Sequence, residues 1–524
     1  MRGTDVAPAA PAGARGVLDR AFAALAQPRT VVGLILAYCL AHFLVRLAVS
    51  PVFTLDEAEQ MLFAQSLKLG YRFRHPPLIT WLVSLTQGAF GLSLPVLSGL
   101  KYLIMASGFL AYFAGARAFL EDVRLAGFAT FAFFLTYTVG YYPHVDLMHT
   151  VLLMSLLAAA FLMLARLVTR DAPLSDYALA GAVVAAGILA KYVFALFPLT
   201  AALAVALTPA LRARVRPAGA LLTAGVALAL TAPYFAWTAL HDYSLVTLAE
   251  DVAGGKAPFF LLGWAEGLSA LLGALFVFTL PFSLVFAGLF PRALSPRRLA
   301  WALRDDRARV NALVVLLGAG AMALPVFLFG TTDFKARWLH QVLIGFPVLL
   351  FLLARAAYPP EAMKPRLTVL AGATILVAAL GLGARVAAYE GNAARCRSCW
   401  EYQPFDLYAE EIRALGFARG TILVDDMYLG GNLRARFPEA RVLAAGQPPE
   451  IFPAPRGAGG CLIAWIARSE AMPPALADYA RAATGVDAAR LGETRALVHA
   501  LAKAPERTVA IRVVAGSAPE SDCR

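Results

Sequence analysis

Long apolar stretches recur through the first two-thirds of this 524-residue chain, and they constrain its fold more than any other feature. A helix of about 20 apolar residues spans a bilayer, where only helices and closed barrels satisfy every backbone hydrogen bond. Charged residues make up only 15% of the sequence, whereas soluble proteins carry about 25%. We therefore predict a polytopic α-helical membrane protein. About eleven transmembrane helices are expected, at residues 30–49, 98–119, 125–142, 147–166, 177–190, 193–210, 219–239, 260–290, 311–330, 341–356 and 367–384.

Basic residues are distributed unevenly between the segments that connect these stretches. If the N-terminus is cytoplasmic, the cytoplasmic segments hold about twenty Lys and Arg residues and the opposite loops about seven. Basic residues accumulate on the cytoplasmic side of membrane proteins, so this bias places residues 50–97 and those after about 385 outside the cytoplasm. The net charge of +12 follows from this orientation, and no nucleic acid is expected as a partner.

Composition divides the chain into three parts. Residues 1–29 are rich in Ala, Pro and Arg and are expected to form a disordered cytoplasmic tail. Residues 30–384 form the transmembrane domain, with external juxtamembrane helices at 50–97, and residues 385–524 are more polar. In this last part, short apolar runs predict strands at 421–425, 461–467 and 508–514. Helical patterns predict helices at 410–415 and 474–483. We therefore expect a small external α/β domain at the C-terminus.

The first external loop, FTLDEAEQMLFAQSLKLGYRFRHPPLITWL at 53–82, concentrates charge directly after the first apolar stretch. Thr54 followed three residues later by Glu57 has the spacing of a capping box, so a helix is expected to begin there and to end near Gly70. Asp56 and Glu57 lie in its first turn, where the positive end of the helix dipole favours anions. The loop therefore begins with a helix that presents two carboxylates at the membrane boundary.

This expected helix has apolar residues at helical spacing, with polar residues between them. We expect it to lie on the outer bilayer surface as an amphipathic helix. The side chains that would face lipid are Leu55, Leu62, Phe63 and Leu67, and those that would face water are Glu59, Gln60 and Lys68.

An Asp-Glu pair directly after the first span, followed by a Pro-Pro-Leu-x-x-Trp-Leu element, resembles the C-type glycosyltransferase superfamily. That superfamily includes the aminoarabinose transferases of lipid A and the protein O-mannosyltransferases. Within it, LDEAEQ (55–60) and PPLITWL (76–82) are most similar to the lipopolysaccharide galacturonosyltransferases. The resemblance covers the transmembrane domain and the external C-terminal domain. It implies a multi-pass enzyme of the bacterial inner membrane with its active site facing the periplasm.

The resemblance also implies a reaction, the transfer of a sugar from polyprenyl phosphate to lipid A or the lipopolysaccharide core. Galacturonic acid is the first candidate for the sugar, while a protein or another glycan stays open as the acceptor. A secondary transporter is the alternative from another class, although duplicated halves are not evident in the sequence. The expected partners are therefore the lipid-linked sugar, the lipid acceptor and membrane lipids. No cofactor is required, and a divalent metal is left open without a clear ligand set.

Three acidic residues are candidates for catalysis. Asp56 matches the catalytic Asp of the superfamily and is the candidate general base. Glu57 matches the second acid of the motif, although its capping-box role would account for it equally well. Asp146, in YYPHVDLMH, is expected outside, where the superfamily commonly has a second Asp, and acidic residues at such boundaries are usually functional or paired. His144 and His149 beside it are expected to serve as local hydrogen-bonding groups.

Substrate binding is expected to involve cations, because the leaving group is a phosphate. Aminoarabinose transferases carry a Lys before the Pro-Pro pair that is associated with the lipid phosphate, and here that position is His75. The residue expected to bind the lipid phosphate is then Arg72, Arg74 or a more distant cation. Lys191 and the adjacent Tyr192 are candidates from the turn in ILAKYVF, with simple snorkelling of the Lys as the alternative.

A second external segment, TTDFKARWLHQ, contributes three more candidates for substrate binding. They are Lys335, Arg337 and His340, with solvation of a charged loop as the alternative. In the C-terminal part, Asp425 and Asp426 follow an expected strand, and a structural role in the turn is favoured over ligand binding.

Four of the five cysteines fall in the external C-terminal part, where disulfides can form. Cys396 and Cys399 form a C-x-x-C motif, and a zinc site would need a second pair that Cys461 and Cys523 do not obviously provide. A local disulfide between Cys396 and Cys399 is therefore expected, in preference to metal binding or redox catalysis. Cys39 lies in the first apolar stretch.

Overall fold

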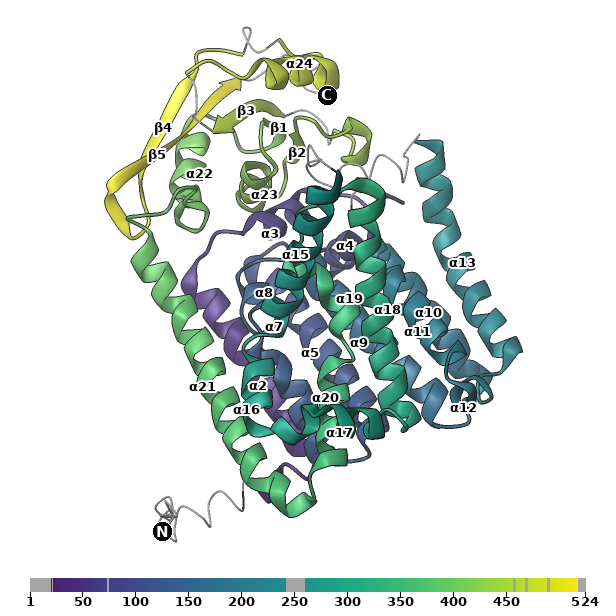
Figure 1. Ribbon diagram of the computed structural model, residues 1–524. Coiled ribbons are helices and arrows are strands. Elements are labelled where there is room, and N and C mark those ends of the chain that lie inside the picture. The colour runs from purple at the N-terminus through teal and green to yellow at the C-terminus, as the bar shows by residue number, and fades with distance from the viewer. Residues whose placement is uncertain are drawn as a thin grey trace, which may run out of the picture.

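The computed structural model describes residues 20, 22–72, 75–241, 260–455, 459–466, 470–487 and 491–516. Most of the expected disordered tail at 1–29 lies outside these residues. Within them, a bundle of long helices carries a smaller α/β domain at one end, and the short helices α3 (Leu55–Phe63) and α4 (Leu78–Phe90) lie where the two meet (Figure 1). The junction is thus built from the charged first loop.

Seven helices in the described part of the chain are long and apolar enough to cross a membrane. They are α2 (Pro28–Val49), α5 (Leu94–Leu120), α9 (Met148–Thr169), α13 (Pro217–Leu240), α15 (Phe260–Thr279), α18 (Asp306–Phe329) and α21 (Pro360–Asn392). Two further apolar helix pairs are sharply bent, and each forms either a broken span or a re-entrant loop. One, Val123–Leu135 with Tyr137–Val145, bends by 85°, and the other, Ala336–Leu343 with Phe346–Ala357, bends by 54°.

The remaining predicted stretches fall on shorter apolar helices, α10 (Leu174–Ala190) and the segment Tyr192–Ala206, which comprises η2 (Tyr192–Ala195) and α11 (Leu196–Ala206). The polytopic helical fold is therefore confirmed. The number of eleven spans is not confirmed, because 17 residues or fewer are short for a full crossing.

The bends and connections use short helices. The first bent pair contains α6 (Val123–Phe131), η1 (Ala132–Leu135), α7 (Tyr137–Gly140) and α8 (Tyr142–Val145). The second contains η4 (Ala336–Leu339), α19 (His340–Leu343) and α20 (Phe346–Ala357). The other short elements are α12 (Pro209–Arg212), α16 (Phe282–Leu289), η3 (Pro291–Leu294) and α17 (Pro296–Ala302).

The C-terminal domain is a five-stranded sheet with strand order β2-β1-β3-β5-β4. The strands β1 (Gly420–Val424), β2 (Arg441–Ala444) and β3 (Gly460–Ile466) are parallel, and β5 (Ala504–Gly516) pairs antiparallel with both β3 and β4 (Arg495–Leu501). The helices α22 (Phe405–Ala414), α23 (Met427–Arg436) and α24 (Pro474–Thr484) complete it, with η5 (Trp400–Tyr402) and η6 (Pro449–Ile451) in the connections. The predicted α/β domain is confirmed, whereas β2, β4 and α23 were not predicted.

The interpretation of α3 as a bilayer-surface helix is wrong for four of the seven side chains it named. The helix ends at Phe63 rather than near Gly70, and Leu62 and Phe63 are buried in a hydrophobic cluster shared with the C-terminal domain. Glu59 and Gln60 do not face water either, since Gln60 is fully buried and the Glu59 side chain is 14% exposed. Leu62 and Phe63 thus pack on protein rather than on lipid, whereas Leu55, Leu67 and Lys68 are exposed.

Hydrogen bonds and close packing hold α3 and its flanking residues against the C-terminal domain. Asn432 on α23 accepts a hydrogen bond from the Phe53 N–H (3.0 Å) and donates one to the Phe53 carbonyl (3.2 Å). The Gln65 side-chain amide donates a hydrogen bond to the Val442 carbonyl on β2 and accepts one from the Val442 N–H, both at 2.8 Å. Gly431 lets α23 approach closely, because a Cβ there would lie 2.0 Å from the Ala58 carbonyl oxygen. The domain therefore fixes the position of the residues that α3 carries.

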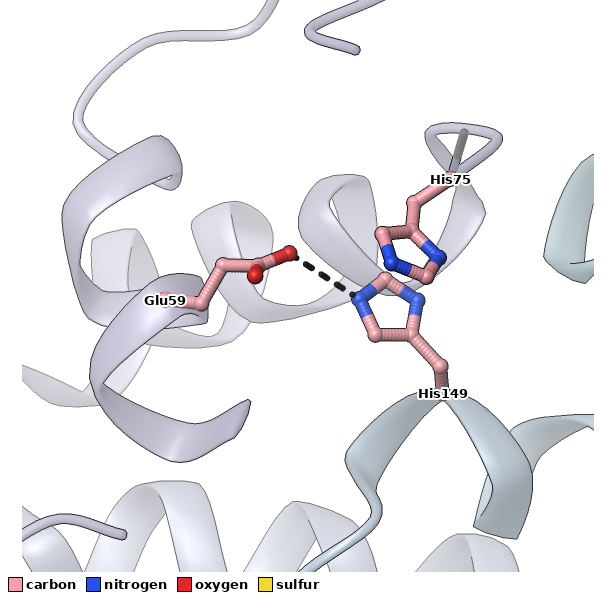
Figure 2. Close-up of side chains that lie close together, drawn as sticks. All are labelled: Glu59, His75 and His149. Carbon is pink, nitrogen blue, oxygen red and sulfur yellow. Dashed lines mark ion pairs between the residues drawn. The ribbon is translucent and has the colours of Figure 1, made fainter. Parts of the chain in front are cut away.

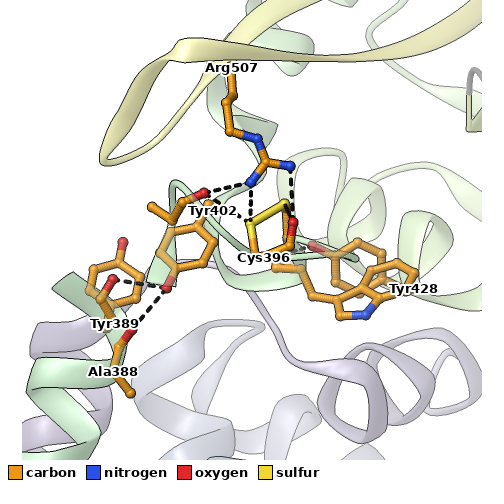
Figure 3. The surroundings of a disulfide bond; sticks show 9 residues. Ala388, Tyr389, Cys396, Tyr402, Tyr428 and Arg507 are labelled. Carbon is orange, nitrogen blue, oxygen red and sulfur yellow. Dashed lines mark hydrogen bonds between the residues drawn. A yellow bond between two sulfur atoms is a disulfide. The ribbon is translucent and has the colours of Figure 1, made fainter. Parts of the chain in front are cut away.

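The expected local disulfide between Cys396 and Cys399 is confirmed (Figure 3). Arg507 on β5 donates hydrogen bonds to the carbonyls of Ala393 (2.9 Å) and Cys396 (3.0 Å), so the disulfide loop is held against the sheet. Cys461 is also disulfide-bonded. The structural role expected for Asp426 is confirmed, because its side chain caps α23 by accepting from the backbone N–H groups at its start.

Candidate active site

Two carboxylates from distant parts of the sequence meet at the N-terminus of α3. Asp146 lies between α8 and α9, and its Oδ1 accepts hydrogen bonds from the Thr54 hydroxyl (2.8 Å) and from the Asp56 backbone N–H (3.1 Å). The next residue, Leu147, has φ of 72°, a left-handed conformation that an apolar L-residue adopts only under constraint. Asp56 and Asp146 are thereby held close together at the end of the bundle that carries the α/β domain.

This proximity changes the acidity of both groups. Burial, followed by the charge of Asp56, raises the pKa of Asp146 to about 7. Burial also raises the pKa of Asp56, and the neighbouring Glu59 charge adds to this, while the positive groups nearby act in the opposite direction. Two carboxylates that repel each other in a buried site are a common source of an acid–base group that works near neutral pH.

Glu57 occupies a different position from its neighbour Asp56. It is fully buried, and Arg46 from α2 binds both of its oxygens at 2.5 and 3.1 Å. The expected capping box is confirmed, since Glu57 also accepts from the Thr54 backbone N–H at 3.0 Å. Burial alone would raise the pKa of Glu57, but the charge and hydrogen bonds of Arg46 outweigh it and lower the pKa to about 2. Glu57 is therefore a permanently ionised group that fixes α3 to α2.

A buried lysine that the sequence analysis missed supports the same site. Lys101 on α5 is 0% exposed, and its Nζ donates to the Asp146 carbonyl oxygen at 2.9 Å. Its charge acts on both Asp56 and Asp146 by lowering their pKa. Lys101 and Arg46 each interrupt an apolar span, and a lone charge in such a span usually has a buried partner. That signal was present in the sequence and would have identified both residues.

The turn after α10 brings a second cation toward the carboxylates. Lys191 is the extended residue between α10 and η2, and its charge acts on Asp56 and on His75 by lowering the pKa of each. The adjacent Tyr192 hydroxyl lies 2.6 Å from the hydroxyl of Tyr234 on α13. The structure thus places Lys191 near Asp56, whereas Tyr192 contributes to the contact between α10, η2 and α13.

The candidates from the second external segment are more dispersed. Arg337 donates to the Tyr142 hydroxyl at 2.9 Å, four residues before Asp146. His340 is buried, with its Nδ1 2.6 Å from the Arg337 carbonyl oxygen. Lys335 is half-exposed and lies 3.9 Å from Asp333. Arg337 therefore supports the bent segment that leads to Asp146, while no hydrogen bond or ion pair joins Lys335 to the carboxylates in the part of the chain that the structure describes.

Glu59, His75 and His149 form a separate cluster beside the carboxylate pair. Their potential ligand atoms all lie within 4.8 Å of one another, and the Glu59 carboxylate points toward the His149 ring, against which the His75 ring is stacked (Figure 2). Arg72 lies 3.3 Å from the other Glu59 oxygen, and an isolated antiparallel β-bridge pairs Arg72 with His75. Arg74 lies outside the described residues.

A helical bundle with an α/β domain docked at one end, and a buried pair of aspartates near the place where the two meet, has the C-type glycosyltransferase fold. The crystal structure of ArnT from Cupriavidus metallidurans bound to undecaprenyl phosphate aligns with 92% of this chain and 97% of that one, with a TM-score of 0.58 and 16% identity. The apo structure of the same protein aligns with a TM-score of 0.54 and 14% identity.

Sequence comparisons place the chain more narrowly within this fold. Residues 74–237 match the family described as dolichyl-phosphate-mannose-protein mannosyltransferase. The chain is 29% identical over 466 residues to the lipopolysaccharide core galacturonosyltransferase RgtB of Rhizobium johnstonii. This alignment covers 87% of this chain and 92% of that protein. It is 28% identical over 459 residues to RgtA of the same organism, covering 84% and 87%. The expected resemblance to the C-type superfamily and to lipopolysaccharide galacturonosyltransferases is confirmed.

Proposed function

We propose that this protein is a glycosyltransferase that moves galacturonic acid from a polyprenyl-phosphate donor to the lipopolysaccharide core or lipid A. In this proposal it works in the bacterial inner membrane, with Asp56 and Asp146 facing the periplasm. The observation that carries the proposal is the buried Asp56–Asp146 pair, held at a helix N-terminus with Lys101 and Lys191 nearby. The similarity to proteins named as lipopolysaccharide core galacturonosyltransferases supports the choice of sugar and acceptor.

The geometry suits a displacement at the anomeric carbon of the donor. Asp56 accepts the proton of the acceptor hydroxyl, whose oxygen then forms the new bond to that carbon. The bond between the anomeric carbon and the phosphate oxygen breaks, and polyprenyl phosphate leaves with the electron pair. Lys191 and Arg72 supply positive charge for the phosphate and the uronate carboxylate. Asp146 holds the backbone of Asp56 in place, and its negative charge keeps the Asp56 carboxylate basic. Glu57 does not contact the substrate and instead fixes α3 to α2 through Arg46.

A donor comparison tests this proposal. The purified protein is offered polyprenyl phosphates that carry galacturonate, galactose, mannose or aminoarabinose, with lipopolysaccharide core or lipid A as the acceptor. We expect transfer of galacturonate to exceed that of the other sugars, because Arg binds a carboxylate through paired hydrogen bonds whereas an amine would be repelled. Transfer of a neutral or cationic sugar in preference to galacturonate would contradict the assignment of the donor. Transfer to a protein acceptor alone would contradict the assignment of the acceptor.

The coupling of the two aspartates predicts a specific pH dependence. Since the pKa of Asp146 is raised to about 7 and that of Asp56 is also raised, the pair gains a proton as the pH falls, and transfer should fall with it. Asp146→Asn keeps an oxygen for the Thr54 hydroxyl and the Asp56 N–H but removes the charge. The acid limb of the pH–rate profile should therefore move to lower pH by about one unit. Initial rates between about pH 5 and 9 measure this shift, and an unmoved profile would show that the two carboxylates do not titrate together.

A further inference from the structure

The Glu59, His75 and His149 cluster lies beside the carboxylate pair. Glu59 follows Asp56 by three residues on α3, and residues three apart on a helix lie on the same face, about 5–6 Å apart between Cβ atoms. His149 lies in the first turn of α9, just after Asp146, and the charges of Glu59 and His149 both act on the pKa of Asp56. The cluster is therefore a second polar group next to the carboxylate pair, and His75 reaches it from the segment before α4.

The three side chains converge as ligands of one ion would. The distance from His149 Nε2 to Glu59 Oε1 is 3.5 Å, and the rings of His75 and His149 have centroids 4.3 Å apart. Zinc binds imidazole nitrogen and carboxylate oxygen at about 2.0–2.2 Å, so two ligands of a tetrahedral ion lie roughly 3.4 Å apart. The Glu59–His149 distance already has this value, and the potential ligand atoms of all three side chains lie within 4.8 Å of one another.

A second observation concerns hydrogen bonding in this cluster. His75 Nδ1 and His149 Nδ1 are buried, and neither has a hydrogen-bond partner among the residues that the structure describes, while the partner of Glu59 Oε1 is His149 Nε2 in the ion pair at 3.5 Å. Buried polar atoms in native proteins are normally paired, so two unpartnered imidazole nitrogens in one cluster point to a partner other than the chain itself. Figure 2 shows the Glu59 carboxylate pointing toward the His149 ring, with the His75 ring beside it.

The neighbours of the cluster permit an ion. Arg72 is bound to the Glu59 Oε2 atom at 3.3 Å and leaves Oε1 to face the histidines. The Gln60 amide nitrogen lies 3.1 Å from His149 Nε2, so this amide must release the imidazole when an ion binds. The Thr80 hydroxyl, 2.8 Å from Gln60 Oε1, is a group to which the turned amide can donate instead.

The donor set selects the kind of ion. Two imidazole nitrogens and one carboxylate oxygen suit Zn²⁺, whereas Mg²⁺ and Ca²⁺ prefer oxygen ligands throughout. Three protein ligands also leave one of the four positions of zinc open. We propose that Glu59, His75 and His149 form a zinc site beside the Asp56–Asp146 pair, and that its open position receives the phosphate of the lipid donor. The second part of this statement rests on the proposed function, and the first part does not.

Metal content tests the site without any measurement of transfer. The full-length protein in detergent is stripped with a chelator, reloaded with Zn²⁺, passed through a desalting column and analysed for zinc per chain. We expect about one ion per chain, with losses of about tenfold or more in Glu59→Gln and in His149→Gln. His499→Gln is the matched control, because His499 pairs with Glu411 at 2.8 Å in the C-terminal domain and belongs to no three-ligand cluster among the described residues. This variant should keep its zinc.

A spectroscopic measurement on the unaltered protein avoids reliance on variants that fail to fold. Co²⁺ in place of Zn²⁺ should give the strong visible absorption of a tetrahedral site, and added Zn²⁺ should abolish it. The proposed site would be overturned by any of three results. These are a zinc content well below one ion per chain, the absence of this absorption, and a zinc loss in His499→Gln equal to that in the cluster variants.

The role in phosphate binding has a separate readout. Undecaprenyl phosphate should bind the zinc-loaded protein at least about tenfold more tightly than the stripped protein, and Glu59→Gln should abolish this difference. If zinc binds but the lipid affinity is unchanged, the site stands and its role toward the phosphate is wrong. Failure of the donor comparison, by contrast, would overturn the proposed function while leaving the zinc content as measured.

Discussion

Replacing Asp56 by Asn is expected to lower sugar transfer by about 100-fold or more, which is the usual contribution of a general base. The substitution retains the size of the side chain and the backbone N–H that donates to Asp146 at 3.1 Å, so α3 keeps its position. It removes the only feature that the proposed role requires, a carboxylate able to take a proton. Rates with a polyprenyl-phosphate donor, divided by the amount of protein in the membrane, measure the effect.

A matched control separates catalysis from helix capping. Asp426 also lies at the start of a helix, where its side chain accepts hydrogen bonds from the N–H groups of Tyr428 and Leu429, and Asn is an equally good cap. Asp426→Asn should therefore keep transfer near that of the unaltered protein. Transfer by Asp56→Asn at a rate close to that of this control would remove Asp56 from the role of base.

Hydropathy predicted the bundle but not where its helices bend. The stretch at 125–142 reads as one apolar span, yet the chain turns by 85° between Leu135 and Tyr137. Packing permits this turn through Gly140, where a Cβ would lie 2.3 Å from the Phe134 carbonyl oxygen. A hydropathy pattern averages over about 20 residues, so a break at one residue leaves no signal in it.

The error over α3 has a physical cause that applies to any amphipathic helix beside a membrane. Lipid tails and a protein core are equally apolar. The helical spacing of apolar residues such as Leu62 and Phe63 therefore shows that one face of the helix is buried, but it does not show whether lipid or protein covers that face. The contacts of Phe53 with Asn432 and of Gln65 with Val442 span more than 370 residues of sequence. No local pattern encodes partners at that separation.

The candidate site was predicted in part. Asp56 and Asp146 were found through short motifs, and the structure brings them together. Lys101 and Arg46 were missed because the surrounding spans were judged by their average hydropathy rather than by their single charges. His149 was expected to be a local hydrogen-bonding group, and its convergence with Glu59 and His75 depends on the packing of α9 against α3, which the sequence does not specify.

Arg46→Met is expected to destabilise the folded protein by about 3–5 kcal/mol, because it leaves a buried carboxylate without its partner. Arg46 is 1% exposed, and besides Glu57 it binds the carbonyl oxygens of Ser50 at 2.7 Å and Val52 at 2.8 Å. The sign follows from the pKa of Glu57, which at about 2 keeps this group ionised at every working pH. Thermal unfolding in detergent and the yield of folded protein measure the loss.

The source of that loss can be isolated with two further variants. Arg117→Met removes the same charge from an exposed position on α5, where Arg117 lies 5.7 Å from the Phe113 ring, and it should change stability by less than about 1 kcal/mol. Arg46→Met combined with Glu57→Met removes both charges and should recover much of the stability that Arg46→Met loses, since well-packed apolar pairs often replace buried ion pairs without cost. If the double variant is as unstable as Arg46→Met, the two backbone carbonyls, rather than Glu57, are what Arg46 stabilises. Only recovery in the double variant would establish that Arg46 is present to neutralise the acid next to the proposed base.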